Sequence, residues 1–367
     1  MARIAFVLPD FGGGGAERVA LTLIRAFVAR GHDIDLVLMQ AEGALLSELP
    51  AAVRLFDLNA PGLRATLTGL RDYLRAERPD AIQASMWPLT VTAIVARRLA
   101  RSSARLVVSD HTTLSIHYGG SWRLRAALRL TTRFFYPRAD ARIIVSERAA
   151  DDLARISGLD RSAIVVVYNP IDRPTSPISN EDADRIWSGR GDARILSVGA
   201  LKAVKNFPLL IRAFARVAAR RPARLIIVGE GKERDALAQL AGQEGVGDRV
   251  VLAGYAADPW PYYRSAELFV LASDYEGFGN VLVEAMAVGT KVVSTDCESG
   301  PGEILDGGRF GTLVPCGDAE ALAAGIDSEL DKARDPEMLK ARAQSLSGDD
   351  AIERYLRLLL PDEGERR

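Results

Sequence analysis

Short apolar runs alternate with helical stretches along most of this chain. Arg3–Leu8 is strand-like, a glycine run follows at 12–15, and residues 16–30 have helical spacing. Further strands are expected at 33–39, 81–84, 105–109, 141–145 and 164–168. A strand–helix–strand order repeated in this way favours a parallel sheet with helices on both faces. The pattern therefore predicts an α/β fold.

The alternation breaks once and then restarts. Residues 169–193 begin with Asn169-Pro170 and continue into a Pro/Ser/Asp-rich segment, which indicates an interdomain connection. Beyond it, strands are expected at 195–198, 224–228, 250–252, 268–271, 291–294 and 312–314, with helices at 208–220 and 232–243. A length of 367 residues also suits about two domains. We predict two doubly wound domains, 1–170 and 171–348, that face each other across a ligand-binding cleft.

Composition narrows the class of protein. Hydrophobic residues make up 48% and charged residues 26%, which is typical of a soluble globular protein and not of a disordered or collagen-like one. A net charge of −1 argues against nucleic acid as a partner. This balance hides an asymmetry. Residues 1–170 hold 22 Lys and Arg against 16 Asp and Glu, whereas residues 171–367 hold 25 against 32. Such asymmetry suggests different partners for the two halves.

The sequence also favours a cytoplasmic setting. No apolar run reaches about 18 residues, so no membrane-spanning helix is expected. The first nine residues lack the features of a signal peptide. Cys297 and Cys316 are far apart and lack metal-ligand spacing, which fits a reducing compartment.

The segment 274–287 carries the clearest chemical signal. Glu276 and Glu284 are separated by seven residues, and Gly277 and Gly279 permit close approach of the backbone to a ligand. A helix that begins near Asn280 would present its free N–H groups as an anion site. An anion site beside two carboxylates suits a molecule with both phosphates and sugar hydroxyls.

At these residues the chain resembles a known family. Glu-Gly-Phe-Gly-Asn-(x)3-Glu-Ala-Met at 276–286 is similar to the E-x7-E motif of retaining GT-B glycosyltransferases of the family-4 type. Four more segments resemble motifs of that family in the right order, at 12–19, 168–172, 198–207 and 294–305. The resemblance covers nearly the whole chain, and five ordered motifs are specific where one alone is weak.

The resemblance implies a GT-B fold whose last segment, 349–367, is a helix returning to the first domain plus a tail. It implies transfer of a sugar, a UDP-linked hexose or N-acetylhexosamine, to a glycan or lipid-linked acceptor in polysaccharide, lipopolysaccharide or glycolipid assembly. The first domain would bind the acceptor and the second the donor. Retention in this family is ascribed to front-face attack, in which the leaving phosphate takes the acceptor proton. No cofactor and no metal ion are implied.

The same resemblance assigns residues to roles. Lys205 contacts the diphosphate, Glu284 the ribose and Glu276 the donor sugar, while His111 lies near the transferred group. The remaining substrate-binding positions implied are Gly13, Gly14, Gly15, Gly199, Lys202, Gly229, Gly231, Gly254, Tyr255, Gly277, Phe278, Gly279 and Asn280. The chain departs from the family at Ala200, where many relatives have Arg. Lys202 is the candidate replacement for this missing cation.

Residues 122–135 form a predicted helix with an arginine face. Arg125, Arg129 and Arg133 recur every four residues beside Trp122 and Phe134. A basic face with aromatic neighbours suits an anionic membrane surface, which would place the protein on the inner face of the membrane. The alternative is a solvated arginine face over an ordinary core stripe.

Other functions remain open beside transfer. A GT-B-related nucleotide-sugar epimerase needs no acceptor, so acceptor-dependent release of UDP separates the two enzymes. A non-catalytic nucleotide-sugar-binding protein is supported only by Ala200. A dinucleotide oxidoreductase is disfavoured because the run at 12–15 lacks G-x-G-x-x-G spacing with a following acidic residue.

Overall fold

A computed structural model of the chain describes residues 1–171, 179–188, 192–333, 335–347 and 349–361. Residues 172–178 and 189–191 of the predicted connection, and residues 362–367 of the predicted tail, lie outside these ranges. The chain divides into two compact units. One comprises Met1–Pro170 with Gly348–Arg367, and the other Ile171–Ser347.

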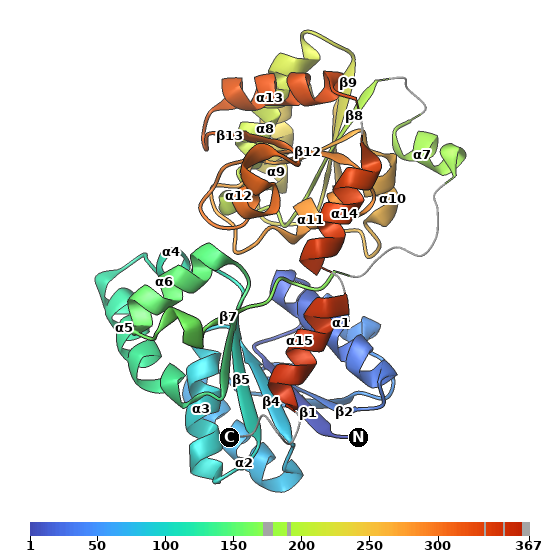
Figure 1. The fold of residues 1–367 in the computed structure, drawn as a ribbon. Helices are drawn as coiled ribbons and strands as arrows, with labels where there is room; N and C mark the ends of the chain where they lie inside the picture. The colour runs from blue at the N-terminus through green and yellow to red at the C-terminus, as the bar shows by residue number, and fades with distance from the viewer. Residues whose placement is uncertain (172–178, 189–191, 334, 348, 362–367) are drawn as a thin grey trace. The chain divides into compact units, whose positions relative to one another are not determined.

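Unit 1 is built on a seven-stranded parallel sheet (Figure 1). Its order is β3 (Arg54–Asp57), β2 (Asp33–Leu38), β1 (Arg3–Leu8), β4 (Ala81–Ser85), β5 (Arg105–Asp110), β6 (Ala141–Ile144) and β7 (Val165–Val166). The helices are α1 (Gly15–Ala29), α2 (Leu63–Glu77), α3 (Leu89–Ala100), α4 (Leu114–His117), α5 (Trp122–Phe135), α6 (Glu147–Ser157) and α15 (Asp349–Leu359). Two cores form because strand side chains alternate between the faces: Ala5 and Val7 pack into one, Ile4 and Phe6 into the other.

Helix α15 packs on the face of the unit 1 sheet that α1 covers (Figure 1). Its buried residues Ala351, Tyr355 and Leu359 recur every four positions, which places them on one side of the helix. They join the core that contains Ile4 and Phe6. The expected return of the last helix to the first domain is therefore present.

Unit 2 has a six-stranded parallel sheet. Its order is β10 (Val250–Gly254), β9 (Ala223–Val228), β8 (Ala193–Val198), β11 (Leu268–Leu271), β12 (Lys291–Thr295) and β13 (Thr312–Val314). The helices are α7 (Asn180–Ile186), α8 (Phe207–Ala218), α9 (Arg234–Gln243), α10 (Trp260–Ser265), α11 (Asn280–Ala287), α12 (Pro301–Ile304), α13 (Ala319–Asp331) and α14 (Pro336–Ser347). From β8 the strands β9 and β10 are added on one side of the sheet, and β11, β12 and β13 are then added on the other side of β8. Ligands in such sheets bind at this switch point, beyond the carboxyl ends of the strands.

The expected α/β class with two parallel sheets is confirmed. Three details differ from the predicted elements. Helix α7 lies within 169–193, where only a connection was expected. Strand β3 was not expected, because three of its four residues are exposed and it forms no continuous apolar run at the sheet edge. Strand β7 is two residues long where five were predicted.

Candidate active site

Lys205 and Glu276 meet at the centre of unit 2. Lys205 ends a short 3-10 turn in the loop after β8, and Glu276 lies in the loop after β11, the strand beside β8. Lys205 Nζ lies 2.6 Å from Glu276 Oε1, and Ser273 Oγ donates to the same oxygen at 2.6 Å. Glu276 is only 8% exposed. A carboxylate this buried is costly unless it is paired, so the lysine and the serine together hold it in place.

The loops that carry these residues are bonded to each other. Asn206 Nδ2 donates to Asp274 Oδ1 at 2.8 Å, and the Asp274 N–H donates to the Val204 carbonyl at 2.9 Å. The loop after β12 joins them, because Thr295 Oγ1 donates to the Ser273 carbonyl at 2.6 Å. The loops that follow β8, β11 and β12 thus together fix the position of Glu276.

Gly300 completes the contact between the loop after β12 and the loop after β11. Its φ is +92°, and a Cβ built there would lie 1.7 Å from the Phe278 carbonyl oxygen. Phe278 itself is buried, while Ser299 Oγ donates to the Gly277 carbonyl at 2.9 Å. Any larger residue at Gly300 would push the two loops apart.

Glu284, the second carboxylate of the motif, is held by a residue of α10. Helix α11 begins at Asn280, as the sequence predicted, with Gly279 at its N-cap and no side-chain cap. Glu284 lies on this helix, and Tyr263 Oη in α10 donates to its Oε2 at 2.6 Å. Tyr263 is fully buried between the rings of Trp260 and Phe269. Both carboxylates of the E-x7-E motif are therefore positioned by a hydroxyl group, and neither hydroxyl was found from the sequence.

Four of the predicted glycines of unit 2 lie where β8, β9 and β10 end: Gly199, Gly229, Gly231 and Gly254. The Gly199 N–H donates to the Val228 carbonyl at 2.9 Å, and the Gly229 N–H to the Gly254 carbonyl at 2.8 Å. Gly229 has a φ of +148°, and a Cβ there would lie 2.0 Å from the Gly199 carbonyl oxygen. The packing of the protein's own loops therefore explains this glycine without a ligand. Tyr255, beside Gly254, is 47% exposed.

Ala200 and Lys202 lie on the surface of the loop after β8. Both are exposed, and the Lys202 ammonium has no hydrogen bond or ion pair with any residue in the described ranges. Lys205, by contrast, is engaged with Glu276. Of Ala200, Lys202 and Lys205, only Lys202 therefore has a positively charged group without a partner among the described residues.

The predicted residues of unit 1 lie after two strands of its sheet. Gly13 has a φ of +104°, Gly14 is the N-cap of α1 and Gly15 begins the helix, which has no side-chain cap. His111 directly follows β5, and its Nε2 lies 3.3 Å from Ser109 Oγ. Burial lowers the pKa of His111 to about 4, and a hydrogen bond with Asn169 acts in the opposite direction. The imidazole is thus neutral near pH 7.

Asp110, immediately before His111, was not singled out from the sequence. Its Oδ1 accepts from the Trp87 N–H at 2.9 Å and its Oδ2 from Tyr136 Oη at 2.6 Å. Burial raises the pKa of this carboxyl to about 6. These bonds connect the loop after β4 with the end of β5 and so fix the backbone that carries His111.

Helix α5 spans Trp122–Phe135, as predicted, and exposes most of its apolar side chains. Trp122 is 69%, Leu130 57% and Phe134 56% exposed, whereas Leu128 is buried. Arg125, Arg129 and Arg133 are exposed on the same helix. An ordinary core stripe does not account for these side chains, because most of the apolar residues are not in the core.

Within the ranges that the structure describes, no group of three or more His, Cys, Asp or Glu is arranged to hold a metal ion. No described helix is long and apolar enough to cross a membrane.

Family models match both halves of the chain. The model described as Glycosyltransferase Family 4 matches residues 13–173, and that described as Glycosyl transferases group 1 matches residues 180–346. A Campylobacter jejuni relative, N-acetylgalactosamine-N,N'-diacetylbacillosaminyl-diphospho-undecaprenol 4-alpha-N-acetylgalactosaminyltransferase, is 29% identical over 95% of this chain and 96% of its own. LpsE of Rhizobium meliloti, a lipopolysaccharide core biosynthesis glycosyltransferase, is 29% identical over 86% of this chain and 85% of its own.

Solved structures share the fold. Anabaena HepE, in complex with UDP and glucose, has a TM-score of 0.83 at 23% identity and covers 98% of this chain and 99% of its own. WaaG, a glycosyltransferase involved in lipopolysaccharide biosynthesis, has a TM-score of 0.76 at 18% identity, over 98% of this chain and all of its own. The expected GT-B fold is confirmed. The chain belongs to the glycosyltransferases, with a Family 4 first half and a group 1 second half.

Proposed function

We propose that this glycosyltransferase moves a hexose or N-acetylhexosamine from a UDP-linked donor to a glycan or lipid-linked saccharide, in polysaccharide, lipopolysaccharide or glycolipid assembly. The observation that carries the proposal is the cluster of Lys205, Glu276 and Ser273 beside the first turn of α11. The names of the Campylobacter and Rhizobium relatives support the acceptor class, and the UDP in the HepE complex supports the donor.

The charges of this cluster suit a diphosphate leaving group. An ammonium has three N–H donors, so Lys205 can keep Glu276 and still bind a phosphate oxygen. The free N–H groups at the start of α11 add partial positive charge where negative charge grows in the transition state. Glu276 would accept from the sugar hydroxyls. Glu284, oriented by Tyr263, would contact the ribose hydroxyls.

We also assign retention of the anomeric configuration and independence from metal ions to this reaction. Lys205 and the α11 amides supply the positive charge that a metal ion supplies elsewhere. Because the leaving phosphate takes the acceptor proton, a neutral His111 has no need to act as a strong base. The product anomer, read from the coupling constant of the new glycosidic proton, tests retention. Full activity after treatment with EDTA tests metal independence.

We assign the acceptor to unit 1 and the donor to unit 2, and place α5 on an anionic membrane surface at the cytoplasmic face. The exposed Trp122, Leu130 and Phe134 beside three arginines support this placement, since such helices combine apolar insertion with attraction to anionic lipid. Replacement of Trp122 and Phe134 by serine should abolish sedimentation with vesicles containing phosphatidylglycerol. Leu55→Ser, at an exposed leucine of β3, is the matched control and should still sediment. Equal sedimentation of all variants would refute the placement.

Acceptor dependence separates transfer from its alternatives. A transferase releases UDP rapidly only when an acceptor is present. An epimerase interconverts the nucleotide sugars without an acceptor, and a binding protein releases no UDP. Assay of UDP from a panel of UDP-sugars, with and without a lipid-linked saccharide, distinguishes these three outcomes.

A further inference from the structure

Three buried polar side chains meet in the sheet of unit 1 beside His111. Gln83 and Ser85 belong to β4 and Ser109 to β5, and none of the three is more than 1% exposed. In the register of the two strands, Ser85 lies opposite Ser109. Gln83 lies two positions before Ser85, and residues two apart on a strand point to the same face of the sheet. The three side chains therefore form one polar layer near the carboxyl ends of these strands.

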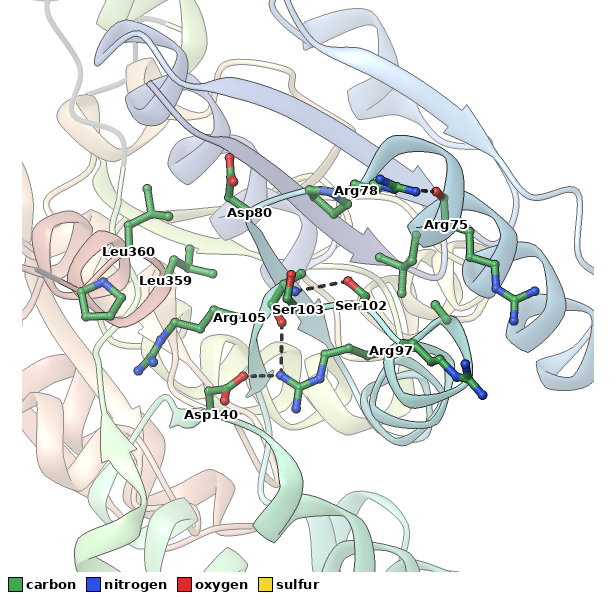
Figure 2. A pocket seen from close by; sticks show the side chains of 16 residues that line it. Arg75, Arg78, Asp80, Arg97, Ser102, Ser103, Arg105, Asp140, Leu359 and Leu360 are labelled. Carbon is green, nitrogen blue, oxygen red and sulfur yellow. Dashed lines mark hydrogen bonds and ion pairs between the residues drawn. The ribbon is translucent and has the colours of Figure 1, made fainter. Parts of the chain in front are cut away.

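This polar layer is separate from the cavity at the other end of the same strands. That cavity is bordered by Asp80, which directly precedes β4, and by Arg105, with which β5 begins (Figure 2). Gln83, Ser85 and Ser109 do not line it. Buried amide and hydroxyl groups are costly unless they are hydrogen-bonded, so the layer has to be accounted for by its own contacts.

Gln83 donates both of its amide hydrogens within the layer. Its Nε2 lies 3.1 Å from Ser85 Oγ and 2.7 Å from Ser109 Oγ. The two serine oxygens lie 3.0 Å apart, and Ser109 Oγ lies 3.3 Å from His111 Nε2. Each serine thus accepts a hydrogen bond from Gln83 and has one hydroxyl hydrogen of its own to donate.

Only one direction of donation gives both hydroxyl hydrogens an acceptor. If Ser109 donated to Ser85, the hydrogen of Ser85 would have no acceptor among the described residues. If Ser85 donates to Ser109, the hydrogen of Ser109 is directed to His111 Nε2. Because leaving a buried donor unpaired is costly, the second arrangement is favoured.

The same accounting fixes the hydrogen of the His111 ring. A neutral imidazole carries one hydrogen, on one of its two nitrogens. His111 is neutral near pH 7, since burial lowers its pKa to about 4. With Nε2 accepting from Ser109, the ring hydrogen is on Nδ1. The hydrogen bond with Asn169 raises the pKa of the ring, as an acceptor of a ring hydrogen does, so Asn169 is the acceptor for Nδ1.

We propose that Ser109 is a positioning residue for His111. Its hydroxyl holds the ring in the tautomer with the hydrogen on Nδ1, and it occupies the lone pair of Nε2. Neither ring nitrogen is then free to take a proton from a substrate. The ring contacts the transferred sugar as an uncharged group of fixed orientation, and the acceptor proton leaves with the phosphate. This role rests on the proposed function, in which His111 lies near the transferred sugar, whereas the tautomer itself does not.

NMR spectra of the histidine ring nitrogens in the free enzyme test the tautomer. The chain has three histidines, and His111→Gln identifies the signals of His111. We expect the hydrogen on Nδ1 in the wild type and in Ser85→Ala, which loses an equally buried hydroxyl but keeps the bond from Ser109 to Nε2. Ser109→Ala should instead show exchange between both tautomers. A hydrogen on Nε2 in the wild type would overturn the proposal, and so would a spectrum of Ser109→Ala identical to that of the wild type.

Initial rates of acceptor-dependent UDP release test the consequence for the reaction. Ser109→Ala should lower kcat about tenfold, while the KM for the UDP-sugar stays at the wild-type value because the proposed donor residues belong to unit 2. Ser85→Ala should keep the wild-type kcat. If the wild type has the expected tautomer and Ser109→Ala keeps the wild-type kcat, the positioning role is refuted and the transfer reaction stands. If the wild type transfers no sugar, the proposed function fails instead, and the wild-type spectrum still decides the tautomer without any variant.

Discussion

Replacing Tyr263 by phenylalanine removes one hydroxyl group and leaves the ring in place. That hydroxyl donates to Glu284 Oε2 at 2.6 Å, whereas the ring packs on Trp260 and Phe269 with centroid distances of 5.7 and 5.6 Å. A hydrogen bond to a charged group contributes about 1.5–3 kcal/mol, and water can replace part of it at a half-buried carboxylate. We therefore expect the free energy of unfolding to fall by about 1–2 kcal/mol. For a domain of this size each kcal/mol lowers Tm by about 2–4 °C.

Donor binding should also weaken in Tyr263→Phe. Without the hydroxyl, Glu284 loses one of the contacts that orient it, and ordering the side chain when UDP binds costs up to about 1.5–2 kcal/mol of entropy. Because 1.4 kcal/mol is a factor of ten, the Kd for UDP should rise by about three- to tenfold. Isothermal titration calorimetry measures the Kd, and differential scanning calorimetry measures Tm.

Tyr262→Phe is the matched control for this experiment. The Tyr262 hydroxyl has no hydrogen bond with any described residue, so both quantities should stay near the wild-type values. In a Glu284→Ala background the effect of Tyr263→Phe on UDP binding should disappear, since the two side chains act as one unit. If Tyr263→Phe behaves like Tyr262→Phe in both assays, the positioning of Glu284 by Tyr263 is refuted.

Three further predictions concern the loops and unit 1. Ser273→Ala removes the hydroxyl from Glu276 and should lower kcat about tenfold in initial-rate assays, as expected when a positioning hydrogen bond of about 1.4 kcal/mol is lost; an unchanged kcat would contradict this role. Lys202→Ala should weaken UDP binding several-fold and Ala200→Arg should strengthen it, while the control variant Lys340→Ala in α14 should leave the Kd for UDP unchanged. If Lys202→Ala and Ala200→Arg also leave this Kd unchanged, Lys202 is not the replacement cation. His111 binds a proton near pH 4 in the folded protein and near pH 6.5 in the unfolded chain, so its contribution to the free energy of unfolding falls as the pH drops from 6.5 to 4. The imidazole NMR signal of His111 should therefore not titrate between pH 5.5 and 8, and a midpoint near 6.5 would disprove its burial.

Local patterns were sufficient to predict part of the fold. The helices at Trp122–Phe135 and from Asn280 follow from spacing and from glycine positions, and both begin where expected. Strand β3 was missed because an exposed edge strand such as Arg54–Asp57 carries neither a continuous apolar run nor a clear alternation.

The contacts within the candidate site required the structure. Tyr263 lies 21 positions before Glu284, and Lys205 lies 71 positions before Glu276. No periodicity links residues so far apart. Lys205 and Glu276 were each indicated by resemblance, but their contact depends on the pairing of β8 with β11. Tyr263 gave no signal, because a buried tyrosine in a short helix has the same sequence appearance whether it bonds to a carboxylate or only packs.

The rate of acceptor-dependent UDP release by Lys205→Ala and Glu276→Gln tests the central claim most directly. Both variants alter the pair joined at 2.6 Å, and both should reduce kcat at least a hundredfold, in line with the loss of about 3 kcal/mol of transition-state stabilisation. Lys340→Ala should retain the wild-type rate. If folded Lys205→Ala and Glu276→Gln release UDP as fast as the wild type, this cluster is not the site of sugar transfer.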